Sequence, residues 1–432
     1  MLAGRKTLKP EHKNTKVKGR ITLKAAVMYG ANASGKSNFV KALKYGQDLL
    51  IHPRQGIPSY QSFRLQEQYG QKPTRMEYEL QHKGKNYAYG FVFNKEQILE
   101  EWLYEITEKT EKELFSRTVG GEFSITPILD KNKNEEERSF LAFTAKATPK
   151  NKLFLSEVYF RNVRDNVEHI DDLLNVVDWF RNSLKIFFPD EKYKGALLFE
   201  KEGNGDLLQI YQRFLEYFDT GISKVLLEEV DEKQVKLPKG LLDRITNDLL
   251  DDTSENVRAI VEHNKHDLIS IVKKGTELSY HKFFTQRIDL TTGKEVVFEM
   301  SEESDGTNRI MDFIPIMLDL VKGGNIFVID EMERSLHPNL IHDFFKLYFE
   351  LSGEKESQLI IASHESTLLN QDLLRQDEIW FAHKNTMGAT ELSSLEEYSV
   401  RFDKKIQKDY LQGRFKAVPR LGDSSQLLAD LT

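Results

Sequence analysis

The chain has 432 residues, 39% of them hydrophobic, and a formal net charge of −7. This length predicts two or three structural units. The absence of cysteine excludes disulfides and thiolate metal sites. No apolar run approaches the roughly 18 residues of a membrane span, and there is no signal-peptide pattern, so we expect a cytoplasmic protein without a membrane partner. The acidic balance argues against nucleic-acid binding over the whole surface.

The first motif in chain order is a glycine-rich loop between an expected strand and an expected helix. Residues 21–29 predict a strand with a buried apolar end, and residues 39–46 carry apolar side chains at helical spacing. Between them, residues 30–37 match G-x-x-x-x-G-K-[ST], the phosphate-binding P-loop, at every fixed position. Backbone N–H groups would hold the phosphates, Lys36 would reach the β- and γ-phosphates from a solvent-facing loop, and Ser37 would bind Mg²⁺. The alternative is a glycine-rich turn that matches by chance. The nucleotide-binding candidates are Gly30, Asn32, Ala33, Ser34, Gly35, Lys36, Ser37 and Asn38.

The middle of the chain changes its hydrophobic period twice. Residues 74–128 alternate over short runs and predict antiparallel strands, with turns at residues 83–85 and 120–121. From about residue 150 to 255 the period becomes helical, and residues 256–300 return to a strand pattern with a hairpin at 290–296.

An amphipathic helix is expected after residues 304–309. Its apolar residues run from Ile310 to Val321 at spacings of three and four, which places them on one face. Ser304 or Asp305 can cap its first turn, and Pro315 should kink the helix or unwind a turn. Taken alone, this segment is an ordinary capped helix.

Two further apolar runs end in polar residues. Residues 326–331 predict a buried parallel strand followed by two acids, and such a strand points its carboxyl end into the ligand crevice of an α/β sheet. Asp330 would hold the Mg²⁺ shell, and Glu331 would orient or deprotonate the attacking water. Residues 358–364 form a second run, which ends in Ser-His, and His364 could touch the γ-phosphate and sense its loss. An exposed acidic turn and a polar strand end are the alternatives.

Together these segments resemble the ABC-type ATPases, the group that includes SMC, RecF and OLD-like proteins. Ser304-Asp305-Gly306-Thr307 resembles a divergent signature motif, and Ser335-Leu336-His337-Pro338 resembles the D-loop. The spacings of 26 residues from Ser304 to Asp330 and 34 from Asp330 to His364 suit that group. The resemblance narrows to the AAA/ABC ATPases of bacterial abortive-infection and anti-phage systems, which include the PARIS ATPase subunit and RloA-type proteins. Residues 30–38, 303–307 and 410–419 carry this closer likeness.

The chain departs from that family at its start. Family members usually begin with a strand of the type Phe-x-x-x-Asn-Phe-x-Ser-Phe, and residues 1–6 resemble the segment that follows it. The resemblance therefore implies a late start, with one sheet strand and its part in adenine recognition missing. The resemblance also implies a Q-loop glutamine, for which Gln61 is the candidate, with a surface loop as its alternative.

The combined interpretation is an α/β protein: a P-loop ABC-type ATPase core with an antiparallel β subdomain and a helical insertion. We expect an N-terminal ATPase lobe over residues 1–150, the insertion over 151–255, a C-terminal lobe over 256–400 and a basic tail over 401–432. In the mechanism that the resemblance implies, one subunit binds MgATP. Ser304 and the N–H groups of Gly306 and Thr307 from a second subunit close on the γ-phosphate, so a homodimer or higher homo-oligomer forms.

Two outputs remain open at this point. The first is a defence-system ATP switch that hydrolyses ATP and controls a separate effector, a toxin or nuclease. The second is a DNA-repair or chromosome-maintenance ATPase of the SMC/RecF type that clamps DNA.

Residues 1–24 carry eight Lys and Arg against one Glu, and residues 401–420 carry seven against two Asp, so these segments are candidates for DNA contact. Solvated charged faces are the alternative for both. A transport ATPase is disfavoured by the large insertions and the divergent signature motif, and a P-loop kinase by the pairing of Glu331 with His364.

Overall fold

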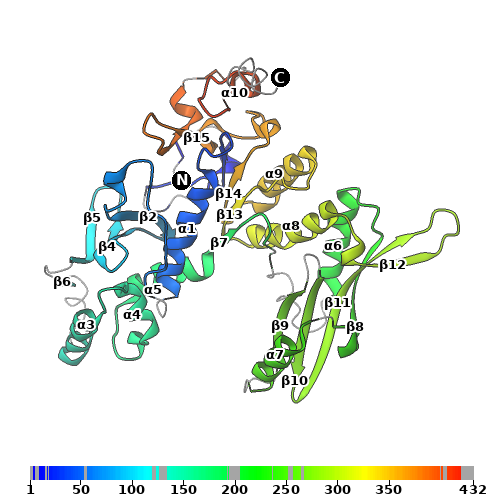
Figure 1. Ribbon diagram of the computed structural model, residues 1–432, viewed down its shortest axis with the longest axis horizontal. Coiled ribbons are helices and arrows are strands. Elements are labelled where there is room, and N and C mark those ends of the chain that lie inside the picture. Colours follow the sequence, from blue (N-terminus) through cyan, green and yellow to red (C-terminus); the bar gives the residue numbers. More distant parts are fainter. Residues whose placement is uncertain are drawn as a thin grey trace, which may run out of the picture. The chain divides into compact units, whose positions relative to one another are not determined.

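The structure is a computed structural model in which the chain forms two compact units (Figure 1). The first comprises Met1–Pro189, Leu320–Glu333 and His342–Thr432, and the second comprises Asp190–Asp319 and Arg334–Ile341. The residues that the structure describes are 3–4, 9–14, 17, 19–52, 56–118, 123–125, 134–191, 193, 205–235, 237–251, 256–263, 267–398, 400–401 and 406–419.

A mostly parallel sheet forms the centre of the first unit, and its described strands follow the order β16-β15-β1-β14-β13-β7. Only β16 runs antiparallel to its neighbour. Every residue of β1 is buried, as expected for a strand covered on both faces. The bounds of these strands are Thr390–Ser394 (β16), Ile379–Lys384 (β15), Ala25–Tyr29 (β1), Gln358–Ser363 (β14), Ile326–Asp330 (β13) and Leu184–Phe187 (β7).

The register of this sheet gathers three strand ends. Tyr29 pairs with Ser363, and Asp330 pairs with the neighbouring Ala362. Because β1, β14 and β13 are parallel, their carboxyl ends lie at the same edge. The predicted P-loop, the two acids and the histidine all follow directly from these ends.

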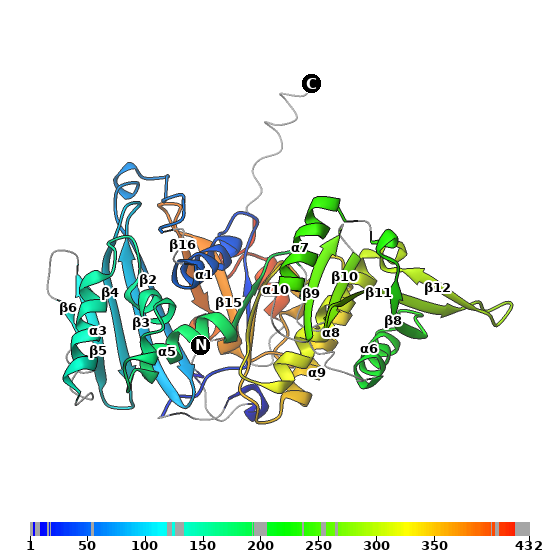
Figure 2. The same ribbon diagram turned by 90° about the horizontal axis from the view of Figure 1, so that it is seen from below.

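An antiparallel sheet completes the first unit, and its strands stand side by side in Figure 2. Its strands pair in chain order, and one hydrophobic core joins this sheet to α1 and to the helices that follow it. These elements are β2 (Thr74–His82), β3 (Lys85–Phe93), β4 (Ile98–Ile106), β5 (Glu111–Thr118), β6 (Phe123–Ser124), α1 (Lys36–Ile51), α3 (Glu135–Ala147), α4 (Phe154–Phe160) and α5 (Asp171–Asp178). Helix α10 (Ile406–Leu411) also belongs to the first unit.

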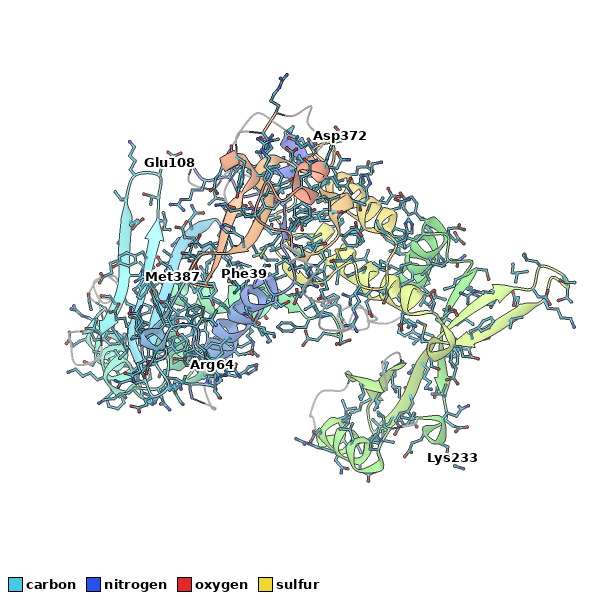
Figure 3. The ribbon with its side chains drawn as sticks, turned by 45° about the horizontal axis from the view of Figure 1, so that its top comes forward. Phe39, Arg64, Glu108, Lys233, Asp372 and Met387 are labelled. Carbon is cyan, nitrogen blue, oxygen red and sulfur yellow. The ribbon has the colours of Figure 1, made fainter. Side chains whose placement is uncertain are left out.

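The second unit combines another antiparallel sheet with helices. Strand β11 lies between β12 and β10, and β8 also pairs with β11. Lys233, labelled in Figure 3, lies in the short 3₁₀ turn Glu232–Gln234 that follows β8. Helix α9 (Pro338–Ser352) begins in this unit and continues into the first. The other elements are α6 (Gly205–Tyr217), β8 (Lys224–Val230), α7 (Lys239–Asp251), β9 (Asn256–His263), β10 (Asp267–Lys274), β11 (Glu277–Ile288), β12 (Glu295–Glu299) and α8 (Asp305–Lys322).

The predicted α/β fold class is confirmed, with corrections in detail. Helix α8 continues through Pro315, so no turn unwinds there. The strand predicted over residues 21–29 begins only at Ala25, because residues 21–24 form no more than isolated β-bridges. The range 151–255 holds helices together with β7 and β8, which the helical period did not indicate. The predicted domain limits stay a prediction, and the turn expected at 120–121 lies outside the described residues.

None of the described helices is long and apolar enough to cross a lipid bilayer.

Candidate nucleotide-binding site

The loop between β1 and α1 has backbone positions that only glycine can occupy. A Cβ on Gly30 would lie 2.4 Å from Ser34 Oγ and 2.6 Å from Ala382 O. Gly35 has φ of 106°, and a Cβ there would lie 2.0 Å from Thr390 Oγ1. Both glycines of the motif are therefore required by the shape of the loop, which wraps closely on itself and against β16.

The first turn of α1 presents its backbone N–H groups. Helix α1 begins at Lys36, and no side chain among the described residues caps it. Such a helix start binds anions through its unsatisfied N–H groups and its partial positive charge. Asn32, Ala33 and Asn38 are exposed around it, and Ser37 is half-buried. Ala33 has a positive φ of 61°, a conformation that a tight phosphate-binding loop uses at a sharp turn.

Lys36 is buried in the loop, contrary to the solvent-facing position expected from the sequence. Its side chain is 4% exposed because Nζ turns back to donate to Gly30 O at 2.7 Å and Ala31 O at 3.3 Å. Burial lowers the pKa of Lys36 to about 8, although the nearby carboxylates of Glu333, Asp330 and Glu331 oppose this shift. The ammonium is thus held inside the loop, where a phosphate group would meet it.

Asp330 supplies the buried oxygen that a cation site needs. The residue is 3% exposed at the end of β13, and its Oδ1 has no hydrogen-bond partner among the described residues. A buried carboxylate oxygen without a donor is costly unless something else satisfies it. Mg²⁺ is usually held by one or two carboxylates together with phosphate oxygens and water. Asp330 and the hydroxyl of Ser37 therefore fit Mg²⁺ bound with a nucleotide.

Glu331 adopts a strained backbone conformation at the same edge. Its φ is 52°, and its N–H donates to Ala362 O at 2.9 Å, which fixes the turn after β13. A non-glycine residue in the left-handed region costs about 1 to 3 kcal/mol and is found disproportionately at functional sites. The half-buried side chain is available to orient a water molecule there.

His364 lies beside Lys36. Its Nδ1 is 3.3 Å from Lys36 Nζ. Burial and the adjacent lysine charge lower the pKa of His364, so the ring is neutral at pH 7, and Nδ1 accepts from the ammonium. The two groups expected to touch a γ-phosphate therefore contact each other in this structure.

Glu333 is a site residue that sequence reasoning missed. One carboxylate oxygen, Oε1, accepts the backbone N–H of His364, and the other is buried without a partner among the described residues. It is also the strongest of the carboxylates that oppose the lowered pKa of Lys36. The only sequence signal was a third acid, three residues after Asp330.

Thr390 is a second missed residue, and nothing in its sequence context indicated it. Its hydroxyl donates to Ser34 O at 2.8 Å and accepts from Lys384 Nζ at 3.0 Å. The bond to Ser34 fastens the β15–β16 hairpin to the P-loop. Figure 3 labels Met387 in the turn of this hairpin and Phe39 on α1. A residue 356 positions away thus fixes the shape of the loop.

The segment that resembles a signature motif belongs to the second unit. Ser304 Oγ accepts the N–H of Thr307 at 3.1 Å, which confirms the predicted cap of α8. This bond occupies one of the two N–H groups that were expected to face a phosphate. Gly306 lies close to the predicted D-loop, since a Cβ on it would lie 3.0 Å from Ser335 O. Asn308 Nδ2 donates to the carbonyls of Met300, Glu303 and Ser304 and so holds the turn.

The remaining candidates do not join the site. Gln61 is exposed in an irregular segment, as its surface-loop alternative predicts. Of the basic stretches, Lys9, Arg20 and Arg414 bind protein oxygen atoms, and Lys24 is fully buried. Lys404, Lys405 and Arg420 lie outside the described residues.

A protein-family model described as "AAA domain, putative AbiEii toxin, Type IV TA system" matches residues 25–370. No curated protein matches the chain. One similar structure is an Smc head bound to the C-terminal winged-helix domain of ScpA, with 12% identity, a TM-score of 0.35, and coverage of 88% of this chain and 94% of that one. The SMC head domain of Thermotoga maritima has 12% identity, a TM-score of 0.29, and coverage of 88% and 97%. An Smc head with an extended coiled coil, bound to the C-terminal domain of ScpA derived from Pyrococcus furiosus, has 11% identity, a TM-score of 0.30, and coverage of 92% and 98%.

Lys36→Ala should abolish ATP binding in calorimetry, because the loop loses its buried ammonium, while the far-UV circular dichroism stays that of the wild type. In the wild type, affinity should fall as the pH rises through about 8, since the empty site then holds a neutral lysine. Undiminished affinity in Lys36→Ala would show that the nucleotide binds elsewhere.

Glu333→Gln should move this alkaline loss of ATP affinity to lower pH, because the carboxylate that most opposes the lowered pKa of Lys36 is gone. The turnover number should also fall, since the N–H of His364 loses a charged acceptor. The matched control is Glu354→Gln at an exposed acid. The same pH profile in both variants and the wild type would contradict an electrostatic role for Glu333.

Proposed function

Because the chain belongs to the family described as "AAA domain, putative AbiEii toxin, Type IV TA system", we propose that it is an ATP-binding and ATP-hydrolysing switch. The switch assembles through ATP and controls a separate effector in an abortive-infection system directed against phage. The observation that carries the ATPase proposal is the meeting of Lys36, Asp330 and His364 at one edge of a parallel sheet. Within the family, we place the chain with the defence ATPases of the PARIS and RloA type.

The proposed chemistry follows from what each side chain can do. The N–H groups of the first turn of α1 bind the phosphates, and Lys36 exchanges its contacts with the Gly30 carbonyl and His364 for phosphate oxygens. Asp330 and Ser37 would hold Mg²⁺, which when bound neutralises charge on the phosphates. Glu331 orients the attacking water and accepts its proton. Once Lys36 moves to the phosphate, His364 can hydrogen-bond the γ-phosphate.

The second half of the site comes, in this proposal, from another copy of the chain. The capped turn at Ser304 lies at the start of α8, whose N-terminal partial charge favours an anion. The N–H of Gly306 donates to the γ-phosphate that the P-loop of the other copy binds. Ser304 and Thr307 of the same turn also contact this phosphate. Loss of the γ-phosphate then removes the ligand that both copies share, so hydrolysis switches the assembly.

The effector is proposed to be a separate toxin or nuclease. The family description names a toxin–antitoxin system, which supports a toxin-related partner. Contact with DNA through the basic segments remains part of this proposal. This effector would dock on a surface that differs between the ATP-bound assembly and the free chain.

Ser304→Arg and Lys36→Ala chains should each lack ATPase activity when alone. Mixed together, they can form one intact interface from the P-loop of one chain and the signature turn of the other, so part of the activity should return. The measurement is phosphate release from the mixture, with mixed assembly shown by two affinity tags. Mixed assembly without any recovery would contradict a site shared between subunits.

The purified chain should hydrolyse ATP and leave DNA and RNA intact in Mg²⁺ or Mn²⁺, because its proposed metal site serves the nucleotide. Co-purification from the native host should bring down a toxin or nuclease in ATP-bound preparations. Cleavage of DNA by the chain alone that persists in Lys36→Ala would place the effector within this chain and overturn the proposal.

A further inference from the structure

A cavity of about 650 Å³ lies within the first unit at the amino ends of its central strands. Its walls include Ile326 and Gln358, the first residues of β13 and β14, together with Trp380 near the start of β15. The lining also includes the end of β2 and the start of β3, at Gln81 and Asn86. This volume falls within the range of small-molecule sites.

The cavity is separate from the phosphate loop. Strand β13 has Ile326 in the cavity wall and Asp330 at the candidate cation site. A strand rises about 3.3 Å per residue, so these two residues are about 13 Å apart along it. The cavity thus lies at the edge of the sheet opposite the one that carries the candidate nucleotide site.

The walls are rich in aromatic rings. Two of the three tryptophans of the chain, Trp179 and Trp380, line the cavity along with Tyr87. Trp380 is only partly buried, and its Nε1 donates to Asp377 O at 3.1 Å, which fixes the plane of the ring. Tyr87 is fully buried and pairs with Leu80, so its ring lies on the face of the β2–β3 pair opposite to Gln81 and Asn86. The fixed ring of Trp380 favours a flat aromatic ligand, because stacking then costs little ordering.

Amide side chains also line the cavity. Gln81 Nε2 donates to Asn86 Oδ1 at 3.2 Å, and Gln358 Nε2 donates to Leu23 O at 2.7 Å. These bonds set the direction of each amide and use only part of its hydrogen-bonding capacity. Asn and Gln are the side chains that pair with the donor and acceptor pattern of a base edge. Aromatic faces together with oriented amides are therefore suited to a nucleobase.

Two cations also line the cavity, each already bound to one carboxylate. Arg20 Nη1 lies 2.6 Å from Glu79, and Lys83 Nζ lies 2.8 Å from Asp178. Both side chains keep further N–H donors for an anion. The carboxylates of Glu79 and Glu356 also line the cavity, so its limited positive charge suits a single phosphate better than a triphosphate.

We propose that this cavity binds a nucleoside monophosphate, with the base against Trp380 and the amides and the phosphate near Arg20. This site is independent of the ATPase proposal, since it shares none of the P-loop residues. It gives the chain a second nucleotide site at the opposite edge of the same sheet.

The test is equilibrium dialysis of AMP, GMP, CMP and UMP against the full chain. The variants are Gln81→Leu, which removes the amide at similar size, and Trp380→Leu, which removes a ring. Trp102→Phe is the matched control, because this third tryptophan lies on β4 beneath Arg75 and outside the cavity. Lys36→Ala is included so that binding at the phosphate loop is recognised, and circular dichroism checks that each variant folds.

At least one monophosphate should bind the wild type and Lys36→Ala with a Kd below about 1 mM. Gln81→Leu or Trp380→Leu should weaken that binding about tenfold, which is within the range expected for loss of base stacking, and Trp102→Phe should not. The proposal is overturned if none of the four binds. It is also overturned if binding is lost in Lys36→Ala but unchanged in both folded cavity variants.

Discussion

Parallel pairing of β1 with β14, and of β14 with β13, fixes the geometry on which the candidate site depends. Tyr29 pairs with Ser363 and Asp330 with Ala362, so the residues that follow the three strands begin at one edge. A slip of one residue in this register would turn the side chain of Asp330 to the other face of the sheet. Segments that are hundreds of residues apart in the chain thus meet because their strands are neighbours in the sheet.

The electrostatics of that edge suit a nucleotide. One buried lysine faces three carboxylates, those of Glu333, Asp330 and Glu331, and Asp330 and Glu333 each have a buried oxygen without a partner among the described residues. Such groups destabilise a site unless a ligand satisfies them. Phosphate oxygens can accept hydrogen bonds from the lysine and from the N–H groups at the helix start. A cation bound with the phosphates can be coordinated by the carboxylates. We therefore expect the unsatisfied groups at this edge to lower the stability of the ligand-free chain and to raise its affinity for a charged ligand.

The sequence predicted the parts of the site whose chemistry is local. The glycines of the P-loop and the apolar strand before the two acids are recognisable because each pattern reflects a backbone requirement within a few residues. Thr390 could not be predicted, because its bond to Ser34 spans 356 positions and depends on the hairpin that carries it. Burial of Lys36 was missed because the motif does not show that its ammonium turns back to Gly30. Strand β7 was missed because its partner β13 is remote in the chain.

We propose that ATP joins two copies of this chain and that hydrolysis separates them. This assembly is tested by the mass of Glu331→Gln in solution, measured by light scattering with MgATP, MgADP or no nucleotide. The substitution keeps the size and hydrogen bonding of Glu331 but removes the carboxylate that would accept a proton from water. A larger assembly should persist only with MgATP and disappear when Ser304→Arg is added. An unchanged mass under all three conditions, with ATP shown to be bound, would contradict assembly through ATP.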